Sequence, residues 1–337
     1  GYASCYYDQM KGSYFQGYGG NVLVMGGSFT MHGGTIENGV AEGGGGNVYV
    51  SNKGTFCMKG GSLSGGQALK KGKNGGNLVI GSGCSFTCSG GTITGGVSRN
   101  YGGNVHMLGT MTMTGGSITG GSVLDINTGR SKDDQIAKNL FLVNGSMTMT
   151  GGRIGGYVAV TDSKAKDGKK PYLCLSGTAQ ITGAKQGHNN LQLNTANDGY
   201  SLDVKNLSKG AKIGVTASGK FTNQTGAGNM SYFASDIGGT ISYVDGCLFE
   251  GRLGCLCGAG KGESHIGKCD GALLPWQSWA SDKTLPTAEG YYCLLRDVQC
   301  GQNSVQAGAH VHLDLNGKTV TGKEGSRIYT TFHEDSH

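Results

Sequence analysis

Four residues in the last third of the chain have the types and spacing of a metal site: Cys255, Cys257, His265 and Cys269. They follow the pattern C-x-C-x7-H-x3-C within a window of 15 residues. Thiolate and imidazole groups this close together in a loop can complete a tetrahedral zinc site. Disulfides in an oxidising compartment are the alternative, and both readings stay open. In either case we expect these residues to hold their segment together and not to perform catalysis.

Outside this group the chain lacks the residues that catalysis would need. Between Gln9 and Leu124 the only acidic residues are Glu37 and Glu42, too few for the paired carboxylates of an enzyme that cleaves polysaccharides. There is no G-x-S-x-G nucleophile motif and no Walker-type phosphate loop. We therefore expect that the protein is not an enzyme and that it has no cofactor, with structural zinc as the one candidate exception.

The distribution of charged and of apolar residues argues against two further classes of partner. The net charge is +6, but the 28 Lys and Arg residues are scattered and do not alternate with aromatic residues, so we expect no nucleic acid partner. No run of 18 apolar residues occurs, so we expect no membrane span.

An internal repeat accounts for many of the 67 glycines. Five copies of one motif carry Gly-Gly pairs at 33, 60, 90, 115 and 151, which are 27, 30, 25 and 36 residues apart. The copies read GSFTMHGGTIENG, GTFCMKGGSLSGG, CSFTCSGGTITGG, GTMTMTGGSITGG and GSMTMTGGRIGG, and four of them follow a block of the type GGNVYV.

Each repeat predicts three short strands and no helix. Phe29 and Met31 alternate with hydroxyl residues, and the equivalent residues of the other copies keep this period of two. Short strands joined by glycine-rich corners and repeated every 25 to 36 residues are typical of a parallel β-helix, in which crossovers are right-handed. The sequence therefore predicts an all-β, right-handed parallel β-helix (solenoid) of roughly ten coils with a Cys-rich linker.

Stacked coils place equivalent residues above one another, about 4.8 Å apart. We expect Phe29, Phe56 and Phe86 to form an interior aromatic stack. We also expect a structural ladder of amides at one corner, bonded to each other and to the turn backbone. Its members are Asn21, Asn47, Asn77, Asn104 and Asn139.

Composition divides the chain into three parts. Residues 1–245 carry the GGNV and Gly-Gly repeats, whereas residues 246–282 are rich in Cys and Trp and form a linker or a metal or disulfide staple. Residues 283–337 resume the alternation without Gly-Gly pairs and are expected to form the first coil or coils of a β-helix. Since the N-terminal residues look like the continuation of such a coil, we expect the 283–337 segment to dock on the N-terminus of the next unit.

The stretch WQSWASDKTLPTAEGYYCLLRDV, with VHLDLNGKTVTG and the GGNVYV and TFCMKGGSLSGG units, resembles a known family. It is similar to right-handed parallel β-helix repeat modules of large secreted or surface proteins of gut Firmicutes. In those proteins a block like Leu285–Val298 usually precedes the Gly-Gly repeats, and here it follows them. The resemblance implies a pectate-lyase-like fold without a catalytic site carried over, in a bacterial protein of the cell surface or the extracellular space.

Together these observations favour an extracellular structural protein, a subunit or tandem unit of a head-to-tail β-helical filament or surface fibre. The partner would then be the protein itself. The alternative is a surface adhesin or a polysaccharide-binding β-helix whose partner is a carbohydrate or cell-wall polymer, held by aromatic residues along one face: Tyr14, Phe15, Tyr18, Tyr49 and Tyr101. A polysaccharide lyase or hydrolase ranks last.

Overall fold

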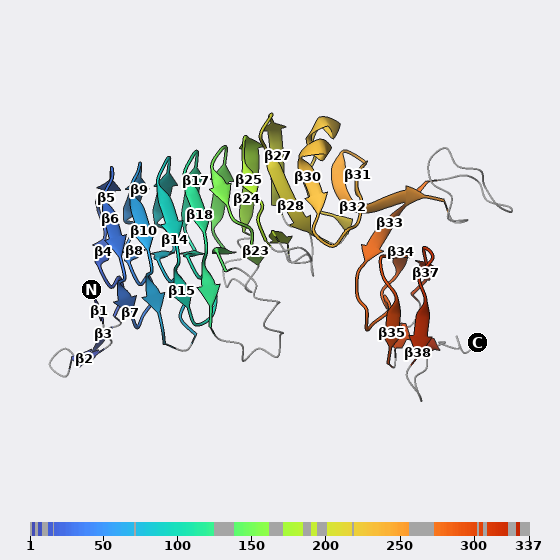
Figure 1. The fold of residues 1–337 in the computed structure, drawn as a ribbon, viewed down its shortest axis with the longest axis horizontal. Helices are drawn as coiled ribbons and strands as arrows, with labels where there is room; N and C mark the ends of the chain where they lie inside the picture. Colours follow the sequence, from blue (N-terminus) through green and yellow to red (C-terminus); the bar gives the residue numbers. More distant parts are fainter. Residues whose placement is uncertain are drawn as a thin grey trace, which may run out of the picture.

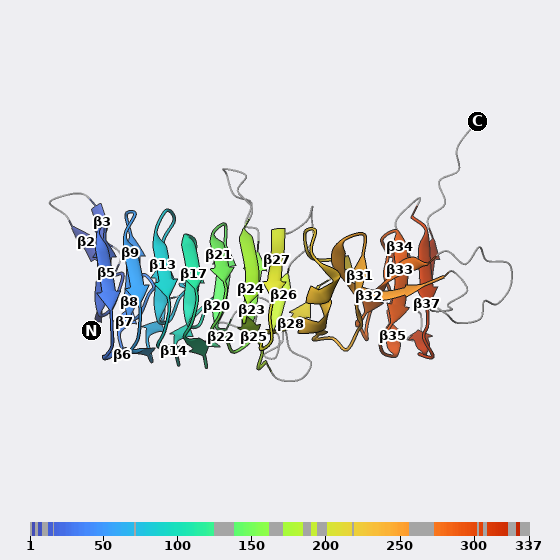
Figure 2. The ribbon, with the colours of Figure 1, turned by 90° about the horizontal axis from the view of Figure 1, so that it is seen from above.

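The computed structural model describes residues 2–3, 6–8, 13–15, 17–70, 72–124, 138–161, 171–184, 190–193, 201–217, 219–255, 273–301, 303–305, 309–322 and 328–330. Nearly all of their regular structure is β-strand, and most strands pair in parallel with strands one coil away. The coils that contain β4 to β28 follow one another along one axis, and the C-terminal coils lie beyond β32 and are offset from that axis (Figures 1 and 2), so the fold is a parallel β-helix, as the repeat predicts.

Three faces of the solenoid are parallel sheets that run along this axis. The first face contains β4 (Val22–Met25), β8 (Val48–Ser51), β12 (Leu78–Ile80), β16 (Val105–Met107), β20 (Leu140–Val143), β23 (Val158–Thr161) and β26 (Leu191–Leu193). The second face contains β5 (Ser28–Met31), β9 (Thr55–Met58), β13 (Ser85–Cys88), β17 (Thr110–Met113), β21 (Ser146–Met149), β24 (Tyr172–Gly177) and β27 (Ser201–Leu207). The third face contains β6 (Thr35–Glu37), β10 (Ser62–Ser64), β14 (Thr92–Thr94), β18 (Ser117–Thr119), β22 (Arg153–Ile154) and β25 (Gln180–Ile181).

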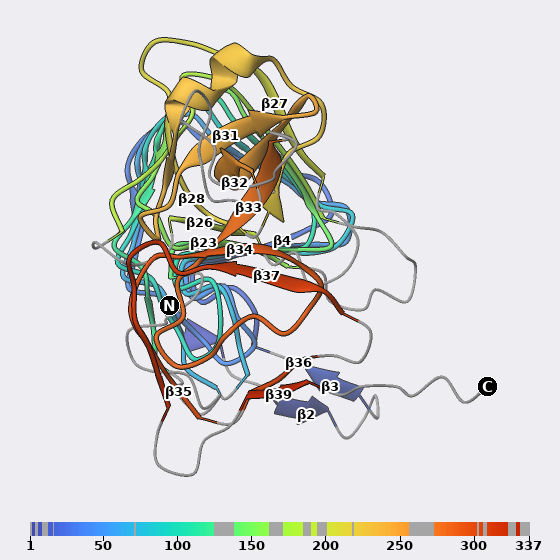
Figure 3. The same ribbon diagram turned by 90° about the vertical axis from the view of Figure 1, so that its right-hand side faces the viewer.

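Four coils also have a short fourth side, which the three-strand repeat did not predict. This side consists of β7 (Val40–Ala41), β11 (Gln67–Ala68), β15 (Val97–Ser98) and β19 (Ser122–Val123), with β1 (Tyr2–Ala3) paired on the outer edge of β7. Strands of two residues carry too little alternation to be recognised in a sequence. The hairpin of β2 (Tyr6–Asp8) and β3 (Ser13–Phe15) lies beside the outline of the coils, as the view along the axis shows (Figure 3).

The stack narrows and closes at β28 (Lys212–Thr216). Ile213 of β28 pairs with Ile181 of the third face, and Val215 pairs with Leu191 of the first face, so one strand joins two faces. Around it lie β29 (Gly219–Lys220), the 3-10 helix η1 (Ala227–Tyr232), β30 (Phe233–Ser235), β31 (Ile241–Val244) and β32 (Cys247–Gly254). Phe221, Phe233 and Leu248 from this region are buried in the same core as the coils, so they cap it.

The segment 246–282, expected as a linker, contains two strands. β32 pairs in antiparallel fashion with β31 and with β33 (Leu274–Trp279), so the GGTISYV sequence ends in a hairpin and not in another coil. β33 then begins the C-terminal coils, which contain β34 (Gly290–Leu294), β35 (Val298–Cys300), β36 (Asn303–Val305), β37 (Val311–Asp314), β38 (Val320–Gly322) and β39 (Ile328–Thr330). The last three strands stack in parallel on the three before them, which makes two coils with three described strands each.

Glycine at the corners follows from the closeness of successive coils. Gly91, the second glycine of its pair, has φ +84°, and a Cβ there would lie 2.6 Å from the carbonyl oxygen of Gly61 one coil earlier. A side chain would therefore be strained by both its own backbone and its neighbour. This explains why the Gly-Gly pairs recur at the same corner.

Candidate functional site: two open coil ends

The asparagine ladder runs along one corner of the first five coils. The Nδ2 of Asn21, Asn47, Asn77 and Asn104 each donates to the Oδ1 of the next asparagine at 2.8, 2.7, 2.8 and 2.9 Å. Asn139 ends the series by donating to the carbonyl oxygen of Gly156 at 2.9 Å.

Backbone groups complete the hydrogen bonds of these amides. For Asn77, the second Nδ2 hydrogen goes to the carbonyl oxygen of Thr94 at 2.8 Å, and Oδ1 also accepts the amide of Gly66 at 2.9 Å. Asn47, Asn77 and Asn104 are fully buried, so each amide replaces water in a place where an unpaired polar group would be costly. The ladder stabilises the corner and has no group left over for a ligand at these three positions.

The interior aromatic stack is formed by Phe29, Phe56 and Phe86. Their ring centroids are 5.4 and 5.2 Å apart and the rings are inclined by 14° and 13°. Phe56 and Phe86 are buried, whereas Phe29 is only partly buried. The core therefore opens to solvent at its first coil.

The same change of burial occurs on all three faces of the first coil. Val22 on β4 and Ile36 on β6 are partly buried like Phe29, although their counterparts one coil later, Val48 and Leu63, are fully buried. The strands β4, β5 and β6 each pair with one neighbour, and among the described strands none pairs with their outer edges. This first coil end is a three-sided frame of open strand edges around an apolar centre.

A second open end lies at the other extreme of the described chain. β37, β38 and β39 pair with β34, β35 and β36, and no described strand covers their far edges. Leu313 and Val320 are partly buried against a small core of Leu285, Leu294 and Val298, and Leu315 is 45% exposed. This last coil end also has three sides.

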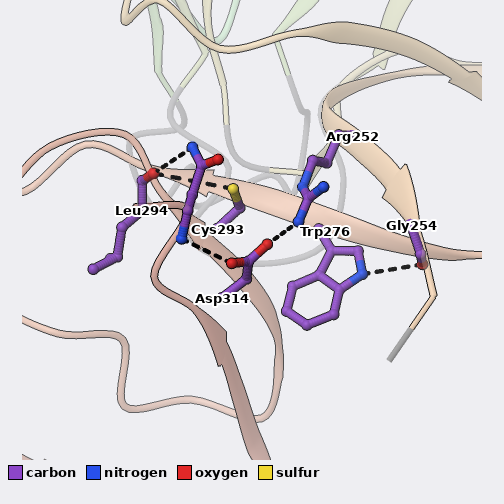
Figure 4. A network of polar contacts seen from close by, with 7 residues as sticks. Arg252, Gly254, Trp276, Cys293, Leu294 and Asp314 are labelled. Atoms are coloured by element: carbon purple, nitrogen blue, oxygen red, sulfur yellow. Dashed lines mark hydrogen bonds and ion pairs between the residues drawn. The ribbon is translucent and has the colours of Figure 1, made fainter. Parts of the chain in front are cut away.

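A polar network fixes the last coil to the capped stack (Figure 4). The Arg252 guanidinium of β32 forms an ion pair with the Asp314 carboxylate of β37 and lies 5.8 Å from the centre of the Trp276 ring. Trp276 is buried and its Nε1 donates to the carbonyl oxygen of Gly254 at 3.0 Å. Asp314 also accepts the amide of Asn316 at 2.8 Å. We call Arg252, Trp276 and Asp314 the joint, because they connect β32 with the final coil.

A buried carboxyl group lies on the same strand as the joint. Glu250 of β32 is 1% exposed, and it accepts the amide of Ala217 at 2.6 Å and the hydroxyl of Ser235. Burial raises the pKa of Glu250 to about 7, in spite of these bonds, and the nearby Asp236 adds to the rise. Burial also raises the pKa of Asp236. Since Glu250 is closed off from solvent, this pair does not form an accessible catalytic centre.

The structure describes one of the four residues of the predicted zinc or disulfide site. Cys255 follows β32 directly and is fully buried, and the other three residues, Cys257, His265 and Cys269, lie outside the described residues. Within the part of the chain that the structure describes, no group of three His, Cys, Asp or Glu side chains is arranged to hold a metal ion. The choice between zinc and disulfides stays a prediction.

Three of the five tyrosine and phenylalanine residues expected along a binding face are held in ring stacks. Tyr18 lies on Tyr49 with centroids 4.2 Å apart, and Tyr101 lies on Phe141 at 4.3 Å. Tyr18, Tyr49 and Tyr101 are half-buried, and burial raises the pKa of Tyr49 to about 12. Each of these rings therefore has a ring partner and stays partly exposed, whereas the side chains of Tyr14 and Phe15 lie outside the part of the chain whose side chains the structure describes.

Sequence reasoning did not identify the joint or Glu250. Arg252 and Asp314 are 62 residues apart, and nothing in the local pattern marks either residue as a partner of the other. The one usable signal was composition, since Glu250 is an acidic residue in the mostly apolar run CLFEGRL.

No helix among the described residues has the length and apolar character required to cross a bilayer. A comparison of the chain with models of protein families finds no match, and comparisons with curated proteins and with solved structures find none either.

Proposed function

We propose that this chain is an extracellular structural protein that joins head to tail, as separate copies or as consecutive units of a longer chain, into a β-helical filament. The observation that supports it is the first coil end, where Val22, Phe29 and Ile36 leave the core of the solenoid partly exposed. An apolar centre inside a frame of unpaired strand edges favours pairing with another strand set.

The occupant we propose for the first coil end is the last coil end of a second copy. β37, β38 and β39 form a coil with three sides. The first coil end offers three strand edges for such a coil to pair with, one each on β4, β5 and β6. β1 is consistent with this pairing. It adds one strand to the fourth side, outside β7, and among the described strands none lies at the same level on the other three faces. A coil of β37, β38 and β39 would supply those faces.

The polarity of the two ends predicts a filament. The first coil end presents the side of its strands that faces away from the following coils, and the last coil end presents the opposite side. Stacking the two therefore continues the direction of the solenoid. Such a contact uses two different surfaces of each copy, so it does not close on itself.

One pair of substitutions on β4 tests the first coil end. Val22→Lys places a charge at the open end of the core, where it reaches water in the free chain and would be buried in the filament. Leu23→Lys is the matched control, because Leu23 is the next residue, is exposed and points to the outside of the coil. By light scattering over a range of concentrations, we expect the native chain and Leu23→Lys to form long assemblies and Val22→Lys to stay monomeric.

A mixing experiment tests the polarity. Leu313→Lys should block the last coil end in the same way, so that each blocked chain alone is a monomer. A mixture of Val22→Lys and Leu313→Lys should then form dimers, because each chain keeps the end that the other has lost. A native chain that stays monomeric at all concentrations, or a mixture that does, would overturn the proposal.

A second candidate function, binding of a carbohydrate or cell-wall polymer, is favoured by one groove. A cavity of about 610 Å³ beside β35 and β38 is lined by Asp282, Lys283, Asp297, Gln299 and Thr321, side chains that suit a hydroxyl-rich ligand. Calorimetry with soluble polysaccharides tests it: binding by the Val22→Lys monomer that is lost in Asp282→Ala would support an adhesin.

A further inference from the structure

β32 is the strand that connects the capped stack with the C-terminal coils. At Phe249 and Glu250 it pairs with β29 on one edge and with β31 on the other, and both close the stack; its second half, from Gly251 to Gly254, pairs with β33, which leads to β34 and β37. Glu250 and Arg252 are two residues apart on this strand. Glu250 reaches back to the stack and Arg252 reaches forward to Asp314.

The contacts of Glu250 join three segments. The amide of Ala217 follows β28, and the hydroxyl of Ser235 belongs to β30, whose strand pairs with β28. Asp236 is the residue after Ser235, and it accepts the amide and the Nδ2 of Asn190 at 2.7 and 2.6 Å. Glu250 is thus packed between the end of the stack and β32, and the charge of the nearby Asp236 acts on it.

Among the described residues, the charged groups on the surrounding elements are engaged elsewhere. Lys220 of β29 pairs with Asp245, and Arg252 of β32 itself pairs with Asp314. The hydroxyl of Tyr243 on β31 donates to the carbonyl oxygen of Thr225. Next to Glu250, β33 contributes Gln277 and Ser278, which carry no charge. Asp236 is the charged group that acts on Glu250, and its charge is of the same sign.

We propose that protonated Glu250 holds β32 on the capped stack and that ionisation of Glu250 releases β32 together with the C-terminal coils, so that pH controls the attachment of these coils to the stack. Within the described part of the chain no cation pairs with this carboxyl group, so its ionised form gains hydration only when β32 separates from Ala217 and Ser235. The consequence for filament formation rests on the proposed function, whereas the opening of β32 does not.

The direction of the pH dependence follows from the pKa of Glu250 in the closed state and in the open state. In the closed state the pKa of Glu250 is about 7, and in water an ordinary glutamate has a value of 4.5. The closed state therefore binds the proton more tightly, and the contact is strongest below the ordinary pKa and weakens as the pH rises to about 7. Between about pH 5 and about pH 8 the equilibrium constant for opening should rise on the order of 50-fold.

Amide hydrogen exchange on the dilute, unassembled chain measures this opening. The amide of Gly251 donates to the carbonyl oxygen of Thr240, and the amide of Leu248 donates to the hydroxyl of Thr222, so both report on the attachment of β32. After correction for the intrinsic rate, their exchange should rise on the order of 50-fold over this pH range. The amide of Thr92, bonded to Gly61 in the middle of the stack, should show no such rise and is the internal reference.

Variants identify the responsible group. Glu250→Gln keeps the shape and cannot ionise, so the corrected exchange of Gly251 and Leu248 should lose most of its rise with pH, and only a smaller contribution from Asp236 should remain. Asp245→Asn removes an exposed carboxylate at the same end of the stack and should keep the native pH dependence.

A rise on the order of 50-fold that persists in Glu250→Gln would overturn the inference. If Glu250→Gln does not fold, carboxyl carbon NMR of the native chain replaces it, and a Glu250 midpoint near 4.5 would have the same effect. A chain that opens with pH but never assembles would leave this inference standing and overturn the filament instead.

Discussion

Phe29 stacks on Phe56 with their ring centroids 5.4 Å apart, yet only Phe56 is sealed from solvent. Phe86 covers the far side of Phe56 at 5.2 Å, and of the described rings none covers the far side of Phe29. In a solenoid each inner coil is buried by its two neighbours, whereas β4, β5 and β6 of the first coil each pair with one neighbour among the described strands. This incompleteness is the basis of the head-to-tail proposal.

An asparagine in the middle of the ladder should contribute more to the free energy of unfolding than the asparagine at its exposed end. Asn77→Ala removes an amide from a fully buried corner and leaves the amide of Gly66 and the carbonyl of Thr94 without that partner. We expect a loss of about 3 kcal/mol or more in the free energy of unfolding, measured with urea. Asn21→Ala, at the exposed end of the same ladder, should cost less than about 1 kcal/mol. Equal losses at the two positions would show that burial does not determine how much each asparagine of the ladder contributes to stability.

Alanine substitutions at two glycines distinguish the loss of stability caused by backbone strain from the loss caused by crowding against the neighbouring coil. Gly83 has φ +73° and open space where a side-chain carbon would lie, so Gly83→Ala should cost about 1 to 2 kcal/mol from the left-handed backbone alone. Gly91→Ala has a similar φ and in addition meets the carbonyl oxygen of Gly61, so it should cost clearly more. Thermal unfolding of the two variants provides the comparison. If both lose the same stability, the coils are less closely packed than the glycine pairs imply.

His106 should make the stack sensitive to acid. Its ring stacks on Phe141, and burial lowers its pKa to about 4 from an ordinary 6.5. The unfolded chain therefore binds the proton more tightly, so the stability is complete above pH 6.5 and falls by about 3 kcal/mol as the pH drops to about 4. His106→Phe should remove this loss in urea titrations at the two pH values. His32→Phe, at an exposed position, is the control and should keep it.

The cysteine cluster should stabilise its own segment and leave the coils unaffected. Native mass spectrometry should show either one bound zinc or, after denaturation, a mass lower by about 2 Da for each disulfide. In either case we expect Cys255→Ser to increase proteolysis within 256–272, while the coil fragments stay resistant, because their burial does not depend on the cluster. Three reduced thiols with no bound metal would contradict both readings.

Local patterns in the sequence were sufficient for the solenoid itself. The period of two around Phe56, the Gly-Gly corner at 90 and 91 and the recurring Asn47 and Asn77 are properties of single repeats, and stacking them follows directly. For this reason the aromatic stack and the asparagine ladder lie where the alignment of the repeats places them.

The two ends and their connection were decided by the tertiary structure. Closure at β28 requires one strand to pair with Ile181 and with Leu191 at once, and the joint brings together Arg252 and Asp314. These contacts occur once and join residues far apart, so no repeat indicates them. The sequence determined what each coil is made of, because a repeated local pattern buries the same side chains every time. Which coil ends remain open, and how Glu250 comes to be buried beside Asp236, depends on long-range packing that only the folded chain contains.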